Sequence, residues 1–141
     1  MMLQPFAKDI WIMDGPVVDF YSFPYPTRMA IIKLSDGSAW VWSPIAITDE
    51  LAEEVLEVVG PVKYIISPNA IHWLFMKDWQ DRFPDALMFA SPGLASRKIA
   101  KDLKFHDTLT DESPMEYSDD IDQLIFHGGI LDEVVFFPQG Q

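Results

Sequence analysis

The sequence contains no cysteine and only three histidines among its 141 residues. Without cysteine there can be no disulfide bond, thiolate zinc site, iron–sulfur cluster or cysteine nucleophile. Long apolar runs are absent as well, since no stretch reaches the ~18 consecutive apolar residues that a membrane-spanning helix needs. The first residues also lack the basic region and apolar run of a secretory signal. We therefore expect a cytoplasmic protein with no membrane partner.

Basic residues are scarce: ten Lys and Arg stand against 22 Asp and Glu, for a formal net charge of −12. This charge repels a phosphate backbone, so we expect no nucleic-acid partner. The acidic stretch between residues 111 and 122 lacks the ligand register of a calcium loop and is interpreted as a solvated loop. Glycine-rich nucleotide-binding motifs are also missing.

The residues that are present can fill one core, because 49% of them are hydrophobic and they include five Trp and ten Phe. We predict a single domain over residues 1–141. In the first third, apolar runs separated by turn residues predict strands over 10–13, 29–34 and 39–42. Asp36-Gly37 predicts a tight hairpin between the last two. The segment 20–27, with two prolines, is expected to be an extended loop.

From residue 48 onward, helical and strand patterns alternate. Thr48 predicts the N-cap of a helix that ends at Gly60-Pro61. The remaining elements are strands over 62–66, 86–90, 124–126 and 134–137, and helices over 69–83 and 94–103. Such alternation predicts an α/β fold with parallel strands and helices packed on a sheet.

Several motifs occur in an order that resembles a known family. They are residues 26–29 (PTRM), 36–44 (DGSAWVWSP), 67–75 (SPNAIHWLF), Trp79, 83–86 (FPDA) and 90–94 (ASPGL). Together they resemble an uncharacterised family of bacterial and plant proteins, related to the metallo-β-lactamase fold, over roughly residues 5–137. The resemblance implies an αββα sandwich, of which this chain holds the N-terminal αβ half, a mixed sheet with helices on one face.

The resemblance also implies a lost metal motif. Active relatives carry His-x-His-x-Asp-His after a strand that ends in Thr or Ser. Here the strand ends in Ser67, and His72 is the one residue of ligand type in the segment that follows. A catalytic zinc needs about three protein ligands, so we expect no metal and no other cofactor. The resulting interpretation is a non-catalytic binding or interaction module. The alternative is a hydrolase-like enzyme of altered chemistry around His72, for which a divalent metal such as zinc is the alternative cofactor.

Members of the resembling family continue past residue 137 into the second half of the sandwich. A chain without that half would present an open sheet face or edge. We therefore expect a partner chain or a second copy, as in a homo-oligomer such as a dimer, to cover it. The small-molecule ligand, if there is one, is not indicated by the sequence.

Four residues are candidates for a site. His72, at the expected start of a helix, and Arg28, ahead of a buried strand, are the catalytic candidates, although a packed histidine and an arginine that tethers backbone carbonyls are the favoured interpretations. His72, His106 and His127 could bind a metal if the fold brought them together, but no spacing supports such a site.

Overall fold

The computed structural model describes residues 3–15, 18–20, 23–25, 27–68, 75–92, 94, 103–127 and 132–138. Its strands are β1 (Gln4–Ala7), β2 (Ile10–Asp14), β3 (Val18–Phe20), β4 (Phe23–Tyr25), β5 (Arg28–Lys33), β6 (Ala39–Trp42), β7 (Val62–Ile66), β8 (Leu87–Ala90), β9 (Asp107–Thr108), β10 (Ile121–His127) and β11 (Asp132–Pro138). Its helices are α1 (Asp49–Glu54) and α2 (Met76–Arg82), and a π-helical segment, η1 (Val55–Val59), continues α1. Among these residues, no helix is long and apolar enough to cross a membrane.

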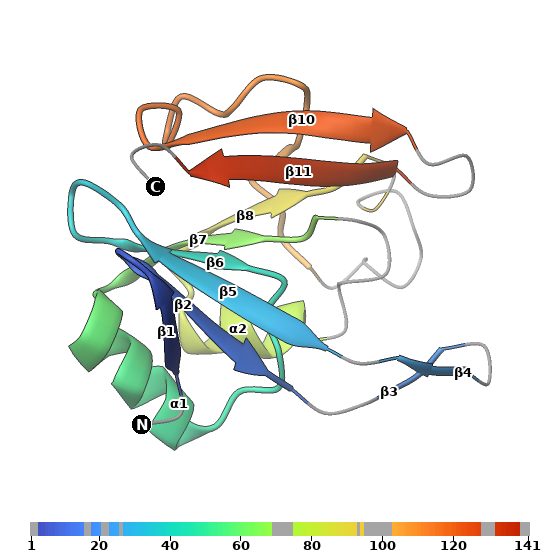
Figure 1. The fold of residues 1–141 in the computed structure, drawn as a ribbon. Helices are drawn as coiled ribbons and strands as arrows, with labels where there is room; N and C mark the ends of the chain where they lie inside the picture. The colour runs from blue at the N-terminus through green and yellow to red at the C-terminus, as the bar shows by residue number, and fades with distance from the viewer. Residues whose placement is uncertain are drawn as a thin grey trace.

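Seven strands form one mixed sheet in the order β1-β2-β5-β6-β7-β8-β9 (Figure 1). Neighbouring strands are antiparallel from β1 to β6 and parallel from β6 to β9. The change of direction falls where the helical sequence pattern begins, because consecutive parallel strands need a crossover connection. The α1–η1 segment supplies that crossover between β6 and β7. The predicted mixed sheet is thus confirmed.

The turn between β5 and β6 forms at the predicted Asp36-Gly37. Gly37 has φ +85°, a left-handed conformation that glycine adopts without strain. The Asp36 carboxylate accepts hydrogen bonds from the Ser38 N–H and hydroxyl at 2.9 and 2.6 Å, and from Lys63 Nζ at 3.1 Å. Gly60, at the end of η1, approaches the same turn so closely that a β-carbon there would lie 2.1 Å from the Gly37 carbonyl oxygen. Only glycine fits at that position.

The helix that begins at Asp49 has the predicted N-cap. Thr48 Oγ1 accepts the Leu51 N–H at 3.1 Å, which satisfies one of the backbone donors that a helix start leaves open. Leu51 and Val55 are fully buried against the sheet. The last five residues before Gly60 are π-helical rather than α-helical, a detail that the apolar pattern does not predict.

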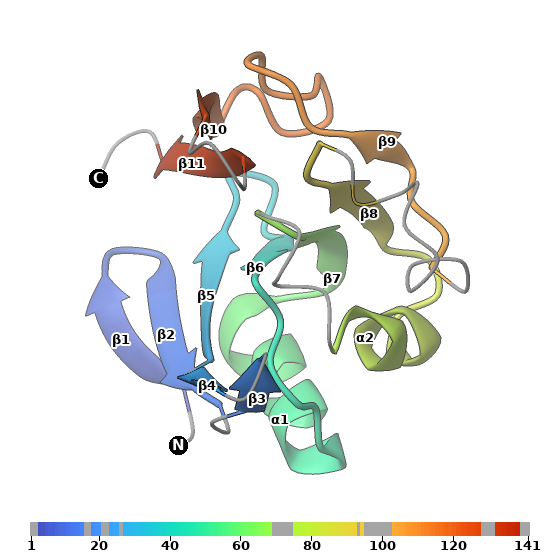
Figure 2. The ribbon, with the colours of Figure 1, turned by 90° about the vertical axis from the view of Figure 1, so that its right-hand side faces the viewer.

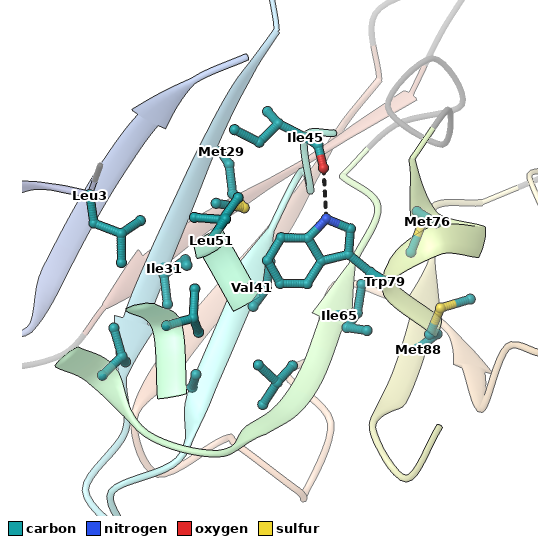
Figure 3. Packing of buried hydrophobic residues seen from close by; sticks show 14 residues of the cluster. Leu3, Met29, Ile31, Val41, Ile45, Leu51, Ile65, Met76, Trp79 and Met88 are labelled. Carbon is teal, nitrogen blue, oxygen red and sulfur yellow. Dashed lines mark hydrogen bonds between the residues drawn. The ribbon is translucent and has the colours of Figure 1, made fainter. Parts of the chain in front are cut away.

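Successive residues of the strands supply two cores on opposite faces of the sheet. The helix-side core contains Ile31, Val41 and Ile65 from the central strands, together with residues of α1, η1 and α2. Figure 3 shows Trp79 of α2 in this core, where its Nε1–H donates to the Ile45 carbonyl oxygen at 2.7 Å. This core fixes both helices on one face, as predicted.

The second core is aromatic and lies on the opposite face. It contains Trp40, Tyr64 and Phe89 from the sheet, and Tyr117 from the segment between β9 and β10. The rings of Trp40, Tyr64 and Phe89 each meet the Tyr117 ring with centroids 5.6 Å apart. The β10–β11 hairpin lies over this face, on the side of the sheet away from the helices (Figure 1). The described residues therefore form three layers: helices, the large sheet and a two-stranded second sheet.

Three predicted segments differ from the structure or lie outside its described part. The predicted loop 20–27 is wrong in part, because β3 and β4 pair as a small antiparallel sheet in which Pro24 lies opposite Asp19. A proline is compatible with an edge strand, since it forfeits only one N–H. The described helix α2 begins at Met76, after a non-helical Phe75, whereas the prediction began at residue 69. Residues 69–74 and 95–102 lie outside the described residues, and so does most of the helix predicted over 94–103.

Candidate functional site

The carboxyl ends of the parallel strands β6, β7 and β8 lie side by side in the sheet. Trp42 is paired with Ile66, and Ile66 with Phe89, so the residues that follow these strands come close to one another. Open α/β sheets bind ligands at this end of their parallel strands. This edge of the sheet is therefore the candidate site.

Each of these three strand ends is followed by a serine and then a proline. The serine row consists of Ser43, Ser67 and Ser91, which are 4%, 0% and 0% exposed. The Ser43 N–H donates to the Ile66 carbonyl and the Ser67 N–H to the Phe89 carbonyl, at 2.9 and 3.0 Å. The following proline has no N–H with which to continue the ladder, so each strand pairing ends there. The three repeated Ser-Pro dipeptides are the signal that the interpretation of the sequence missed.

Two members of the serine row have unusual features. Ser43 has φ +53°, an uncommon conformation for a residue other than glycine. The Ser91 hydroxyl is buried and makes no hydrogen bond to the described protein. A hydroxyl can both donate and accept a hydrogen bond, so a serine row can bind a polar group or simply close strand ends.

Serine oxygen is not among the ligands that zinc prefers, which are Cys sulfur, His nitrogen and carboxylate oxygen. The described strand ends therefore do not fit a zinc site.

The three histidines do not form a described cluster. His106 lies just before β9, where its Nε2 is 3.3 Å from Glu116 Oε1 and its ring packs edge-on against Phe89 with centroids 5.5 Å apart. His127 ends β10, and His72 lies outside the described residues. Within the described part of the chain, no group of three His, Cys, Asp or Glu side chains could hold a metal. The joint metal site of His72, His106 and His127 stays an untested prediction.

Arg28 binds a carboxylate of this chain. Its Nε and Nη2 donate to Asp14 Oδ1 and Oδ2 at 2.6 and 3.4 Å, across the antiparallel pair of β2 and β5. The hydrogen bond and the opposite charge raise the pKa of Arg28 and lower the pKa of Asp14. Both side chains are about two-thirds exposed, at 62% and 68%. The structure thus shows a surface ion pair at Arg28, and the tether to backbone carbonyls stays an untested interpretation.

An apolar groove lies on the face of the sheet away from the helices. It has a volume of about 310 Å³ between β11 and the strands β2, β5 and β6. Figure 2 shows β11 above β5, with β2 and β1 to the left of β5. Its lining residues are all uncharged: Ile10, Ala30, Ile32, Trp42, Val134, Phe136 and Pro138. The hairpin therefore covers part of the second face and leaves a groove beside it.

These features define a metallo-β-lactamase-like fold. A metallo-β-lactamase from Pontibacter korlensis has a TM-score of 0.66 and 16% identity, with 96% of this chain and 66% of that chain covered. One from Hirschia baltica has a TM-score of 0.69 and 17% identity, with 97% and 66% covered. The metallo-β-lactamase FIM-1 from Pseudomonas aeruginosa, in a mono-zinc form, has a TM-score of 0.63 and 12% identity, with 96% and 63% covered.

At such identities the likeness shows the fold alone, and the chain spans about two thirds of the length of these structures. This agrees with the predicted N-terminal half of the sandwich. A family model described as "Domain of unknown function (DUF4336)" matches residues 7–134, and the chain belongs to this family. The predicted family resemblance and fold are thus confirmed. No curated protein matches the sequence.

Proposed function

We propose that this chain is a non-catalytic binding or interaction module built on a metallo-β-lactamase-like fold. The observation that carries the proposal is the serine row: the described strand ends, where ligands bind in α/β sheets, hold buried hydroxyls, and no group of three His, Cys, Asp or Glu among the described residues could hold a metal. Two of these serines bond through their N–H groups to the next strand, and a proline follows each of the three. The serines and the prolines that follow them therefore mainly end the strand pairings.

The apolar groove supports the same proposal from the other side of the sheet. An apolar groove can bind another molecule, because apolar side chains left in contact with water are unfavourable. The groove lining holds three aliphatic or aromatic residues from the second sheet and four from the first. A binding module needs such a surface, whereas catalysis by a metal would need donors at the strand ends.

Metal analysis tests the proposal. The chain would be purified without chelators or metal-affinity resin, incubated with excess zinc, desalted and measured by inductively coupled plasma mass spectrometry. We expect far less than one zinc per chain, and the same trace in a His72→Ala variant. Stoichiometric zinc that His72→Ala removes would overturn the proposal.

A second candidate function is a hydrolase of altered chemistry around His72. The buried Ser91 hydroxyl, which makes no hydrogen bond to the described residues, favours it, since an unsatisfied buried polar group needs an explanation such as a bound ligand. The similar structures are named as metallo-β-lactamases, so a chromogenic β-lactam is the substrate to try. Hydrolysis above buffer that both His72→Ala and Ser91→Ala abolish would favour this candidate over a binding module.

A further inference from the structure

The β3–β4 hairpin projects from the large sheet beyond the ends of β2 and β5 (Figure 1). Among the described strands, β3 and β4 pair only with each other. Ala30 lies opposite Trp42 in the sheet, so the start of β5 lies at the same edge as the carboxyl end of β6. The β3–β4 hairpin therefore departs from the edge that holds the serine row, and its position there depends on the contacts at its base.

The base of this hairpin is closed by a backbone hydrogen bond and by close packing on Ile45. The Gly15 N–H donates to the Thr27 carbonyl at 2.9 Å, which extends the pairing of β2 with β5 by one residue. Gly15 lies so close to its neighbours that a β-carbon there would be 2.5 Å from Thr27 Oγ1 and 2.7 Å from Ile45 Cβ. On the exposed side, Arg28 and Asp14 form their ion pair. Ile45 therefore supports the base from the buried side.

Ile45 is held in turn by α2. Its carbonyl oxygen accepts the Trp79 Nε1–H at 2.7 Å, and both residues are buried (Figure 3). Because a buried N–H without an acceptor is unfavourable, Trp79 and Ile45 keep this contact in the folded chain. In the sequence, α2 follows the strand end at Ser67 and the segment that carries His72. A continuous set of contacts thus runs from α2 through Ile45 to Gly15 at the hairpin base.

We infer that Ile45 couples α2 to the β3–β4 hairpin, so that a displacement of either one changes the position of the other. Closely packed side chains transmit a displacement, because no free volume between them absorbs it. A shift of Trp79 that Ile45 follows must therefore be taken up at Gly15, where even a β-carbon has no room. A molecule that binds at the strand ends and moves α2 would move the hairpin as well. This coupling goes beyond the proposed function and does not depend on it, because it needs neither a bound metal nor its absence.

Hydrogen–deuterium exchange tests the coupling from the side of α2. Trp79→Phe removes the donor to Ile45, and we expect the amides of β3 and β4 to exchange about tenfold faster than in the wild type. Val59→Ala is the control, since it truncates a buried side chain of η1 just before the amino end of β7, at the opposite edge of the sheet. It should leave exchange in β3 and β4 unchanged. Equal exchange of β3 and β4 in the two variants would overturn the inference.

The indole N–H of Trp79 tests the coupling in the opposite direction, because coupling between two sites is reciprocal. Its NMR signal is identified by its absence from the spectrum of Trp79→Phe. Gly15→Ala places a β-carbon against Ile45 and should shift this signal. Arg28→Gln is the control, since it breaks the ion pair on the exposed side of the same base and should leave the signal in place. A signal that does not move in Gly15→Ala, or that moves as far in Arg28→Gln, would contradict the coupling through Ile45.

Discussion

Asp36 accepts hydrogen bonds from Ser38 and from Lys63 of β7, so its carboxylate is stabilised in the ionised form by folding. The Ser38 bonds, followed by the Lys63 interaction, lower the pKa of Asp36 from 3.8 to about 2. A lowered pKa contributes stability above pH 3.8, and this contribution is lost as the pH falls towards 2. Because the side chain is half exposed, we expect about 1 kcal/mol rather than the full linkage value.

The corresponding experiment compares Asp36→Asn with the wild type by urea denaturation at several pH values. Asparagine can still accept a hydrogen bond from Ser38, so the difference reports mainly the lost charge. The free energy of unfolding should be about 1 kcal/mol lower in the variant at pH 7, and the difference should shrink below pH 3.8. A difference that stays constant down to pH 2 would contradict this account.

Trp79 carries a buried polar atom that makes a hydrogen bond. Its Nε1–H donates to the Ile45 carbonyl oxygen at 2.7 Å, and the side chain is completely buried. Trp79→Phe would remove the donor, leave the carbonyl oxygen unsatisfied and open a small cavity. We expect a loss of about 2–3 kcal/mol in thermal or urea denaturation. Trp11→Phe, a half-buried position packed on the same core, is the matched control and should cost less than half as much.

The start of α1 depends on one side chain. Thr48→Ala removes the oxygen that accepts the Leu51 N–H, and should lower the free energy of unfolding by about 1 kcal/mol. Thr48→Ser keeps an equivalent acceptor and should be close to the wild type. Circular dichroism measures the helix content of both Thr48 variants, and urea denaturation measures their free energy of unfolding. If alanine and serine were equally stable, the cap would contribute nothing.

The elements that could be predicted from the sequence are those whose signal is local. Thr48 and Gly60 mark the helix between them, and Asp36-Gly37 marks the β5–β6 turn, because capping and positive φ are properties of a few neighbouring residues. Apolar runs separated by turn residues likewise predicted β2, β5 and β6 closely. The short strands β1 and β9 carry no such pattern, since they form at the two edges of the sheet where pairing with a neighbour decides the structure.

The candidate site was less predictable, because its residues meet only through pairing of distant strands. Nothing in the sequence around Arg28 indicates Asp14 as its partner, which lies opposite it in the β2–β5 register. The contact of His106 with Glu116 depends in the same way on the path of the chain between β9 and β10. The serine row could have been found from the three Ser-Pro dipeptides, because each ends an apolar run that was predicted to be a strand.

At the scale of the whole molecule, the two faces of the large sheet are covered unequally. Helices close one face, whereas the other is covered by the β10–β11 hairpin and by the segment between β9 and β10, with the apolar groove beside them. The hairpin pairs only with itself among the described strands. Its attachment therefore depends on side-chain packing around Tyr117 and on the Val134 N–H bond to the Pro68 carbonyl, and not on a backbone ladder to the large sheet.

Tyr117 connects the two sheets. Its ring contacts Trp40, and its hydroxyl donates to Gln123 Oε1 of β10 at 2.8 Å. Gln123 Nε2 in turn donates to the Thr110 carbonyl at 2.7 Å. Burial raises the pKa of Tyr117, so the folded chain keeps the neutral phenol and loses stability as the pH rises above 10, where the unfolded chain ionises first.

Tyr117→Phe should therefore lower the free energy of unfolding by about 1–2 kcal/mol, because it leaves the buried Gln123 side chain without one partner. Hydrogen–deuterium exchange should quicken in residues 110–127 and stay unchanged in β1 and β2. Tyr64→Phe is the matched control: its hydroxyl donates at 2.9 Å to the Glu116 carbonyl and not to β10. Faster exchange in β10 should therefore follow the change at Tyr117 and not the change at Tyr64. Equal protection of β10 in both variants would show that the Tyr117 hydroxyl does not help to hold the hairpin on the sheet.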